Sequence, residues 1–327
     1  MKKIVRNVLL LALGLSTSMS FAQDWSGNSR TRIEGNNLSE EEKTMSTSTR
    51  NRIGVAWSGE GWSMNASGNH NYTMGDGISA ASIYEASFST DLPLGLNLTG
   101  GRMALHYGDG RIIGNDDWGN YGQTHDGFVV GYDGFAKIDF GIDGQDNSDW
   151  AYLYISKGDK NWNIDGAYLD NNGVVTIGGA LDYSMLESKL GLGVDYWMQG
   201  EEDAGLTAVT LSYKVSDKLN VGFGMDMYTI GWSTAGWGDQ HQFNGAMDNH
   251  GMSGEWSDMN FGLGYTMGDW DAGADYHMMS SDSREVSEID LSLNNKLNDN
   301  VSYGIGFSML SGDSEDKWAY LQISVNP

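Results

Sequence analysis

Large apolar residues alternate with small or polar residues along most of the chain. The alternation is clearest in 190–196, 219–227, 259–265 and 301–309, where Gly, Asn, Asp and Ser separate Leu, Val, Ile, Phe, Tyr and Met. A period of two places successive side chains on opposite faces of a β-strand. No 3.6-residue period is sustained beyond about residue 30, so the pattern predicts an all-β chain.

This period predicts eighteen strands, an even number, as a single-chain bacterial barrel usually has. Sixteen strands is the alternative, because pattern places strand ends only to within about two to four residues. The predicted strands are 28–35, 46–57, 62–73, 81–90, 95–105, 124–132, 135–142, 149–157, 161–169, 173–184, 187–198, 204–215, 218–229, 256–267, 270–280, 285–294, 299–309 and 317–325.

The predicted connections alternate between short turns and long loops, with 36–45, 106–123, 230–255 and 310–316 the long ones and 170–172 an exception. Short periplasmic turns and long external loops are typical of a transmembrane antiparallel β-barrel. In lipid an unpaired backbone amide or carbonyl costs several kcal/mol. Strands 28–35 and 317–325 must therefore pair and close the sheet.

The second face of the strands is unusually small and polar, which suits a wet lumen better than the solvent face of a soluble protein. A secreted soluble β-solenoid or sandwich is the alternative, and the connection lengths argue against it. Aromatic residues recur near strand ends on the apolar face, where the interfacial girdles of a barrel lie. They are Trp57, Trp62, Trp162, Tyr168, Tyr183, Tyr265, Trp270 and Tyr276.

Residues 1–22 have the pattern of a secretory signal peptide. Lys2, Lys3 and Arg6 precede an apolar run that ends in small residues at Ala22. The run is shorter than the roughly 20 apolar residues of a spanning helix, and no later stretch is long enough. We therefore expect residues 23–327 to form a barrel exported through the Sec pathway to the outer membrane of a Gram-negative bacterium.

The composition narrows the function further. Lys and Arg number 19 against 44 Asp and Glu, a formal net charge of −25, so the chain is a poor nucleic-acid binder. It has no cysteine for disulfides. We expect no cofactor and no enzymatic activity, because His106, His125, His241, His250 and His277 lie in predicted loops or at strand ends without a recognisable motif.

The predicted inner face is divided by charge. Arg30 and Arg32 alternate on one strand and Arg50 and Arg52 on the next, so they form a basic stripe. Such a division biases which ions pass, and we predict cation preference. The alternative is that the stripe only neutralises neighbouring carboxylates. The predicted inward acids are Glu85, Asp139, Asp165, Asp182, Asp195, Asp226, Asp271, Asp275, Glu288 and Asp290.

Residues 101–127 resemble the alginate-export family of outer-membrane porins. The matching positions are Gly101, Arg102, Tyr107, Gly108, Asp109, Arg111, Gly114, Asp117, Trp118, Asn120, Asp126 and Gly127. The resemblance implies a monomeric eighteen-stranded barrel constricted by inward loops, with relatives that export anionic polyuronate. Met103 and Ala104 depart from the family pattern, and an acidic lining would repel a polyanion.

Within this segment, Arg102 and Arg111 flank a Gly-Asp-Gly turn, so Asp109 or Asp117 could pair with them and anchor a loop at the barrel mouth. Strict alternation points Arg102 at lipid, so we expect a bulge or a position above the hydrocarbon. Asp143, Asp146 and Asp149 form a weak calcium candidate or a solvated turn. Loop 230–255 either folds inward or lies exposed outside.

These features favour a passive outer-membrane channel for small hydrophilic solutes, in contact with lipid and monomeric if the resemblance holds. One alternative is a dedicated carbohydrate or polyuronate channel, which the 101–127 segment suggests. Another is a non-conducting surface barrel acting as an adhesin or scaffold, whose loops would fill the bore.

Overall fold

The computed structural model describes residues 22–38, 43–75, 77, 79–144, 149–200, 204–233, 237–239, 241, 243–248, 252 and 254–326. The predicted signal peptide, apart from Ala22, lies outside the described residues. Within them, no helix combines the length and apolarity needed to cross a membrane.

In the part of the chain that the structure describes, strands account for nearly all the regular structure, together with one short 3-10 helix at Pro93–Gly95. The alternating segments form strands because their apolar residues fill one face of the sheet. The strands are β1 Ala22–Asn36, β2 Thr44–Gly59, β3 Trp62–Thr73, β4 Ser79–Leu92, β5 Leu96–Met103, β6 His125–Asp133, β7 Lys137–Asp143, β8 Trp150–Gly158, β9 Trp162–Asn171, β10 Val174–Met185, β11 Leu190–Gln199, β12 Ala204–Lys214, β13 Leu219–Tyr228, β14 Trp256–Met267, β15 Trp270–Ser281, β16 Arg284–Asn298, β17 Val301–Gly312 and β18 Asp316–Val325.

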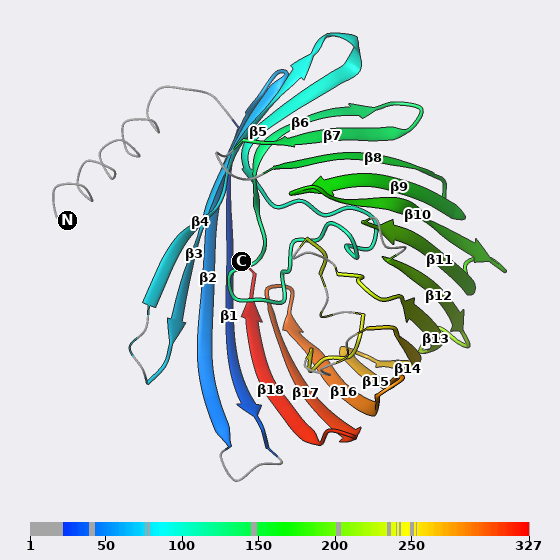
Figure 1. The fold of residues 1–327 in the computed structure, drawn as a ribbon. Coiled ribbons are helices and arrows are strands. Elements are labelled where there is room, and N and C mark those ends of the chain that lie inside the picture. The colour runs from blue at the N-terminus through cyan, green and yellow to red at the C-terminus, as the bar shows by residue number, and fades with distance from the viewer. Residues whose placement is uncertain are drawn as a thin grey trace.

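Each strand pairs antiparallel with its neighbours in sequence, and β1 also pairs with β18 from Ser29 opposite Val325 to Gly35 opposite Ala319. The sheet is therefore a closed barrel of eighteen strands (Figure 1). The predicted fold class and the predicted closure are confirmed, and the sixteen-strand alternative is wrong. Closure leaves no edge strand with unpaired backbone groups.

The two ends of the barrel differ. One end, here the short-turn end, carries tight connections such as residues 60–61 and 299–300. The other, the long-loop end, carries the 104–124 and 229–255 connections. Figure 1 shows the 104–124 segment after β5 and the described part of the 229–255 segment, in yellow between β13 and β14, inside the barrel. For the described part of 229–255, the inward alternative is thus correct.

The outer face is apolar, with exposed side chains such as Ile53, Phe128 and Leu291. A closed barrel with an apolar exterior is suited to a bilayer. The inner face departs from our expectation of small polar residues, because Trp150, Tyr152 and Tyr154 of β8 point inward and are buried. They belong to an apolar cluster inside the barrel.

A charge on the outer face should destabilise the barrel more than the same charge inside. We expect Leu291→Arg, on the lipid-facing side of β16, to lower the free energy of unfolding by about 2–4 kcal/mol. Asn294→Arg, three residues further on and facing the lumen, should change it far less. Equilibrium unfolding in lipid vesicles measures both, and equal losses would contradict the assignment of the two faces.

Candidate functional site

The four arginines of the basic stripe lie on β1 and β2, as predicted. Arg30 is directly opposite Arg50 across the strand pair. Arg30, Arg32 and Arg50 are buried, at 6%, 4% and 3% exposure. Like charges directly opposite one another destabilise a sheet unless other groups compensate them. Loop 104–124 supplies those groups.

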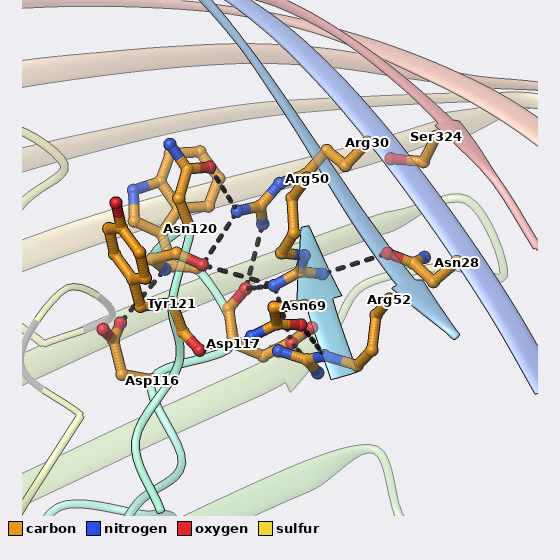
Figure 2. A network of polar contacts seen from close by, with 12 residues as sticks. Asn28, Arg30, Arg50, Arg52, Asn69, Asp116, Asp117, Asn120, Tyr121 and Ser324 are labelled. Atoms are coloured by element: carbon orange, nitrogen blue, oxygen red, sulfur yellow. Dashed lines mark hydrogen bonds and ion pairs between the residues drawn. The ribbon is translucent and has the colours of Figure 1, made fainter. Parts of the chain in front are cut away.

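Arg30 and Arg50 both donate to the tip of this loop (Figure 2). Arg30 donates from Nη1 to the Asp117 carbonyl at 2.9 Å and from Nη2 to the Gly119 carbonyl at 2.9 Å. Arg50 donates from Nη1 to the Asp117 carbonyl at 3.0 Å and to the Gly119 carbonyl at 3.2 Å. The backbone dipoles of the loop tip thus face the centre of the stripe.

The Asp117 carboxylate completes the contact. Its Oδ1 lies 3.0 Å from Nη1 of both Arg50 and Arg52. Arg52 also donates to Asn69 at 2.8 Å and covers the ring of Tyr84 at 3.4 Å. Charge-assisted hydrogen bonds of this kind are stronger than neutral ones. Asp117 therefore pairs with the stripe and not with Arg102 or Arg111. Of the two acids expected to pair with those arginines, Asp109 is the one that lies near Arg111, at 3.6 Å.

Arg32 is held differently. Its Nε and Nη2 donate to Gln322 Oε1 at 2.9 and 2.8 Å, across the β1–β18 closure. Its guanidinium lies 3.6 Å over the ring of Trp118. The Trp118 ring also stacks on His241, at 4.2 Å between ring centroids, and packs edge-on against Trp318 and Tyr320 of β18. Trp118 thus joins loop 104–124 to both the wall and loop 229–255.

The other half of loop 104–124 is held by apolar packing. Leu105, Ile112 and Ile113 are buried in the cluster of inward side chains that includes Tyr152 and Trp197. The Gly110 amide donates to the Tyr107 carbonyl at 3.0 Å, which closes a tight turn, and the Tyr107 amide donates to the Ile113 carbonyl at 3.0 Å. The hydroxyls of Tyr107 and Tyr152 are hydrogen-bonded at 2.8 Å, and burial raises the pKa of Tyr107.

Loop 229–255 contacts the acidic side of the wall through its backbone. The Met247 amide donates to Glu288 Oε1 at 2.9 Å, and the Ala246 amide donates to Asp290 Oδ2 at 3.2 Å. Glu288 is fully buried. The acids of β16 therefore bind amides, as the arginines of β1 and β2 bind carbonyls.

The two loops also bind each other. The Gly114 amide donates to the Trp237 carbonyl at 2.7 Å, and the Asp239 amide donates to the Gly110 carbonyl at 2.9 Å. A Cβ on Gly114 would lie 2.7 Å from the Gly110 carbonyl oxygen and 2.8 Å from the Asp239 nitrogen. Only glycine fits this close approach, so Gly114 allows the loops to form one unit across the bore.

Arg111 projects from loop 104–124 toward the wall. Its Nη1 lies 2.7 Å from Asp226 Oδ2, its Nε lies 3.6 Å from Asp109 Oδ2, and its guanidinium lies 4.0 Å from the Phe243 ring centroid. Burial alone would lower the pKa of Arg111, but the Asp226 carboxylate outweighs it and raises the pKa above its ordinary value. Arg111 is therefore a fixed cation with its partners in place.

A cavity of about 350 Å³ opens beside Arg111. We call it the carboxylate chamber, because five carboxylates face its single guanidinium. A second cavity, of about 300 Å³, shares the walls Phe243 and Asn260 with it. We call this one the aromatic chamber, after Trp318 and Tyr320. Asp275 and Asp290 also line it. The carboxylates of the first chamber are Asp109, Asp165, Asp182, Asp195 and Asp226.

The other predicted inward acids also face the interior, but away from the two chambers. Glu85 accepts from the Asn65 amide group at 3.1 Å. Asp139 lies 3.5 Å from Lys137 Nζ, and Asp271 accepts from the Thr266 hydroxyl at 2.7 Å near the short-turn end.

The sequence analysis missed one buried acid of the inner face, Asp258, and misplaced its partner His277. Asp258 is fully buried, and its Oδ2 lies 2.7 Å from His277 Nδ1. His277 Nε2 lies 3.9 Å from Asp290. His277 is well inside β15, so its assignment to a strand end was wrong. The period-two pattern through Asn260 was the available signal, because it places Asp258 on the same face.

The Arg102 side chain pairs with Asp126 at 2.5 Å. The two are opposite each other on β5 and β6 at the long-loop end, with no register shift. Met103 is buried inside, so alternation points Arg102 outward. Of the two expectations for Arg102, a position above the hydrocarbon is therefore correct. The alternative, a bulge, is not found as a register shift, although Gly101 has φ +115°.

The calcium candidate lies partly outside the described residues. Asp143 ends β7 and Asp149 precedes β8, while Asp146 lies outside the described residues. Among the described residues, no group of three or more His, Cys, Asp or Glu could hold a metal ion.

Comparison with known proteins finds solved structures of similar fold. No family model matches the chain, and no curated protein matches it by sequence. Solved structures do match. The outer membrane protein OpdK of Pseudomonas aeruginosa has a TM-score of 0.77 at 10% identity and covers 94% of this chain and 98% of its own. Pseudomonas aeruginosa OccK2 (OpdF) gives 0.76 at 12%, over 93% and 97%. Acinetobacter baumannii OccAB4 gives 0.74 at 12%, over 93% and 98%.

These neighbours are porins of the Occ group, a different set of eighteen-stranded barrels from the alginate exporters. The alginate-export resemblance drawn from residues 101–127 is therefore wrong. The segment matches in turn-forming glycines and acids, which any tight inward loop needs, and these residue types do not distinguish one barrel family from another.

The anchoring of loop 104–124 can be tested at Asp117. Asp117→Asn removes the negative charge that Arg50 and Arg52 share. We expect this change to weaken the attachment of the loop to the wall by about 1–3 kcal/mol. Amide hydrogen exchange of residues 115–123 should then accelerate by about 5- to 150-fold. Asp116→Asn is the matched control, because Asp116 accepts a hydrogen bond from the Gly119 amide at 3.2 Å and from no other described residue. Equal acceleration in both variants would contradict the assigned role of the stripe.

Proposed function

We propose that the chain is a passive outer-membrane channel for small hydrophilic solutes that prefers cations. One observation carries the preference. The guanidinium groups of the stripe are bound by loop 104–124, whereas the carboxylate chamber keeps five acids against one arginine. A solute in the bore therefore meets mainly negative charge, which attracts cations and repels anions.

The location and class of the channel are supported by its fold. The closed apolar barrel requires a bilayer, and OpdK, which has the same architecture, is an outer membrane protein. The neighbours from Pseudomonas and Acinetobacter are outer-membrane channels of the Occ group. We propose that this chain works as a monomer after removal of residues 1–22.

The other two functions considered from sequence receive less support. A non-conducting barrel would need its loops to fill the bore, but cavities of about 350 and 300 Å³ lie beside them. A polyuronate channel would need accessible arginines, and three of the four stripe arginines are below 10% exposed.

Reversal potentials in planar bilayers under a KCl gradient test the proposal. We expect the wild type to pass K⁺ in preference to Cl⁻. Asp182→Lys, in the carboxylate chamber, should lower the K⁺/Cl⁻ permeability ratio by about two-fold or more, because it reverses one lining charge.

Asp217→Lys is the matched control, since Asp217 is fully exposed in a short turn. It should leave the ratio unchanged. A wild-type channel that prefers Cl⁻, or that carries no current, would overturn the proposed function.

A further inference from the structure

Asp195 of β11 is buried in the wall of the carboxylate chamber without a partner. Its side chain is only 7% exposed and lines the cavity. It forms no hydrogen bond or ion pair with any residue that the structure describes. A buried carboxylate in this state is destabilising unless a cation or a hydrogen-bond donor compensates its charge. The cavity beside Asp195 is where such a partner would lie.

Two more carboxylates lie next to Asp195, grouped around the small side chain of Ala180. In the strand register, Ala180 of β10 is directly opposite both Asp195 of β11 and Asp165 of β9. Asp182 is two residues further along β10, on the same inward face, and all four residues line the cavity. We call the three acids the carboxylate triangle. Strands lie about 4.8 Å apart and diagonal neighbours about 7–8 Å, so the sides of the triangle are about 7, 7 and 10 Å.

The carboxylates of the triangle differ in how they are held. Asp165 accepts a hydrogen bond from the Asn163 amide group, which fixes it. Asp182 has no hydrogen-bond partner among the described residues, and it leans toward β11, because a Cβ on Gly193 would lie only 3.2 Å from its Oδ1. The triangle therefore has one fixed acceptor and two, Asp182 and Asp195, whose oxygens are open to the cavity.

Arg111, the cation of the chamber, is engaged elsewhere. Its Nη1 lies 2.7 Å from Asp226 and its Nε lies 3.6 Å from Asp109, while the Phe243 ring lies 4.0 Å from its guanidinium. These two acids already exceed the charge of Arg111 by one. The triangle thus keeps its own negative charge, which favours a cation of high charge over K⁺.

The size of the triangle selects the form of that cation. Direct ligands lie about 2.0–2.1 Å from Mg²⁺, so acids spaced about 7–10 Å apart do not enter one inner shell together. This agrees with the absence of a direct metal-binding group among the described residues. Mg²⁺ keeps its waters readily, and carboxylates that accept hydrogen bonds from those waters lie about 4–5 Å from the metal. Two such oxygens on opposite sides of the ion are about 8–10 Å apart, which is the scale of the triangle.

We propose that the carboxylate triangle binds one hydrated divalent cation, Mg²⁺ with its water shell, above Ala180. Asp165, Asp182 and Asp195 accept hydrogen bonds from the metal-bound waters, and the methyl group of Ala180 leaves the room that the hydrated ion needs. The inference rests on the proposed cation pathway and adds a binding site within it.

Block of the K⁺ current in planar bilayers tests the site. The probes are Mg²⁺ and hexaamminecobalt(III), whose six ammine ligands do not exchange during the recording, so that it binds only through its outer shell. We expect both ions to block the wild-type channel, with half-block by hexaamminecobalt(III) at the same or a lower concentration, because it has a similar size and one more positive charge.

Asp195→Asn and Asp182→Asn should each raise the half-blocking concentration of both ions about 10-fold, since each removes one charged acceptor. Asp275→Asn is the matched control, because Asp275 is an inward acid of β15 that lines the aromatic chamber and not the carboxylate chamber. It should leave both concentrations unchanged.

Ala180→Leu separates geometry from charge. It keeps every carboxylate but fills the space between them, so it should also raise the half-blocking concentrations about 10-fold. The K⁺ current of the variant shows that the barrel is assembled.

Four results would overturn the inference. They are no block by Mg²⁺, block by Mg²⁺ but not by hexaamminecobalt(III), equal effects of Asp195→Asn and Asp275→Asn, and unchanged block in Ala180→Leu. If the wild type still prefers K⁺ over Cl⁻ in these cases, the cation channel stands and only the divalent site is wrong. A channel without cation preference overturns both.

Discussion

The contact between four arginines and the tip of loop 104–124 organises the interior of this barrel. Arg30 and Arg50 face each other across two strands, a placement that repulsion would make costly in an empty bore. The Asp117 carboxylate and the carbonyls of residues 117–119 compensate that charge. The stripe thereby fixes the loop, and the loop in turn removes most of the stripe's positive charge from the path of a solute.

Loop 229–255 also binds charged side chains of the wall through its backbone, but the wall charges are negative and the backbone groups are amides. Backbone amides of residues 246 and 247 bind Asp290 and Glu288, so each side of the wall holds the part of the backbone that complements its charge. Because the loops bind each other at Gly114, they form one unit. The remaining space is lined by acids that neither loop holds, such as Asp195, together with Asp226, which Arg111 holds, and Asp109 of the loop itself.

The sequence predicted the fold well, because a lipid-facing strand must be apolar at every second position. That local rule placed all eighteen strands, their closure and the inward face of the arginines and acids. It could not predict which groups meet across the bore. The Asp117 contact joins residues 65 and 67 positions apart, and its partners depend on the path of an irregular loop. The inward aromatics of β8 were missed for a similar reason, because they pack in one cluster with apolar residues of loop 104–124.

The organisation of the interior depends most directly on loop 104–124 covering the arginine stripe in the native channel. Arginine-specific labelling with phenylglyoxal, read by mass spectrometry, measures this for each side chain in folded and urea-unfolded protein. Arg30, Arg32 and Arg50 should stay unmodified in the folded channel and react after unfolding, and Asp117→Asn should make Arg50 reactive in the folded state. Rapid labelling of Arg30 and Arg50 in the folded wild type would contradict the account, because the stripe would then be open to solutes.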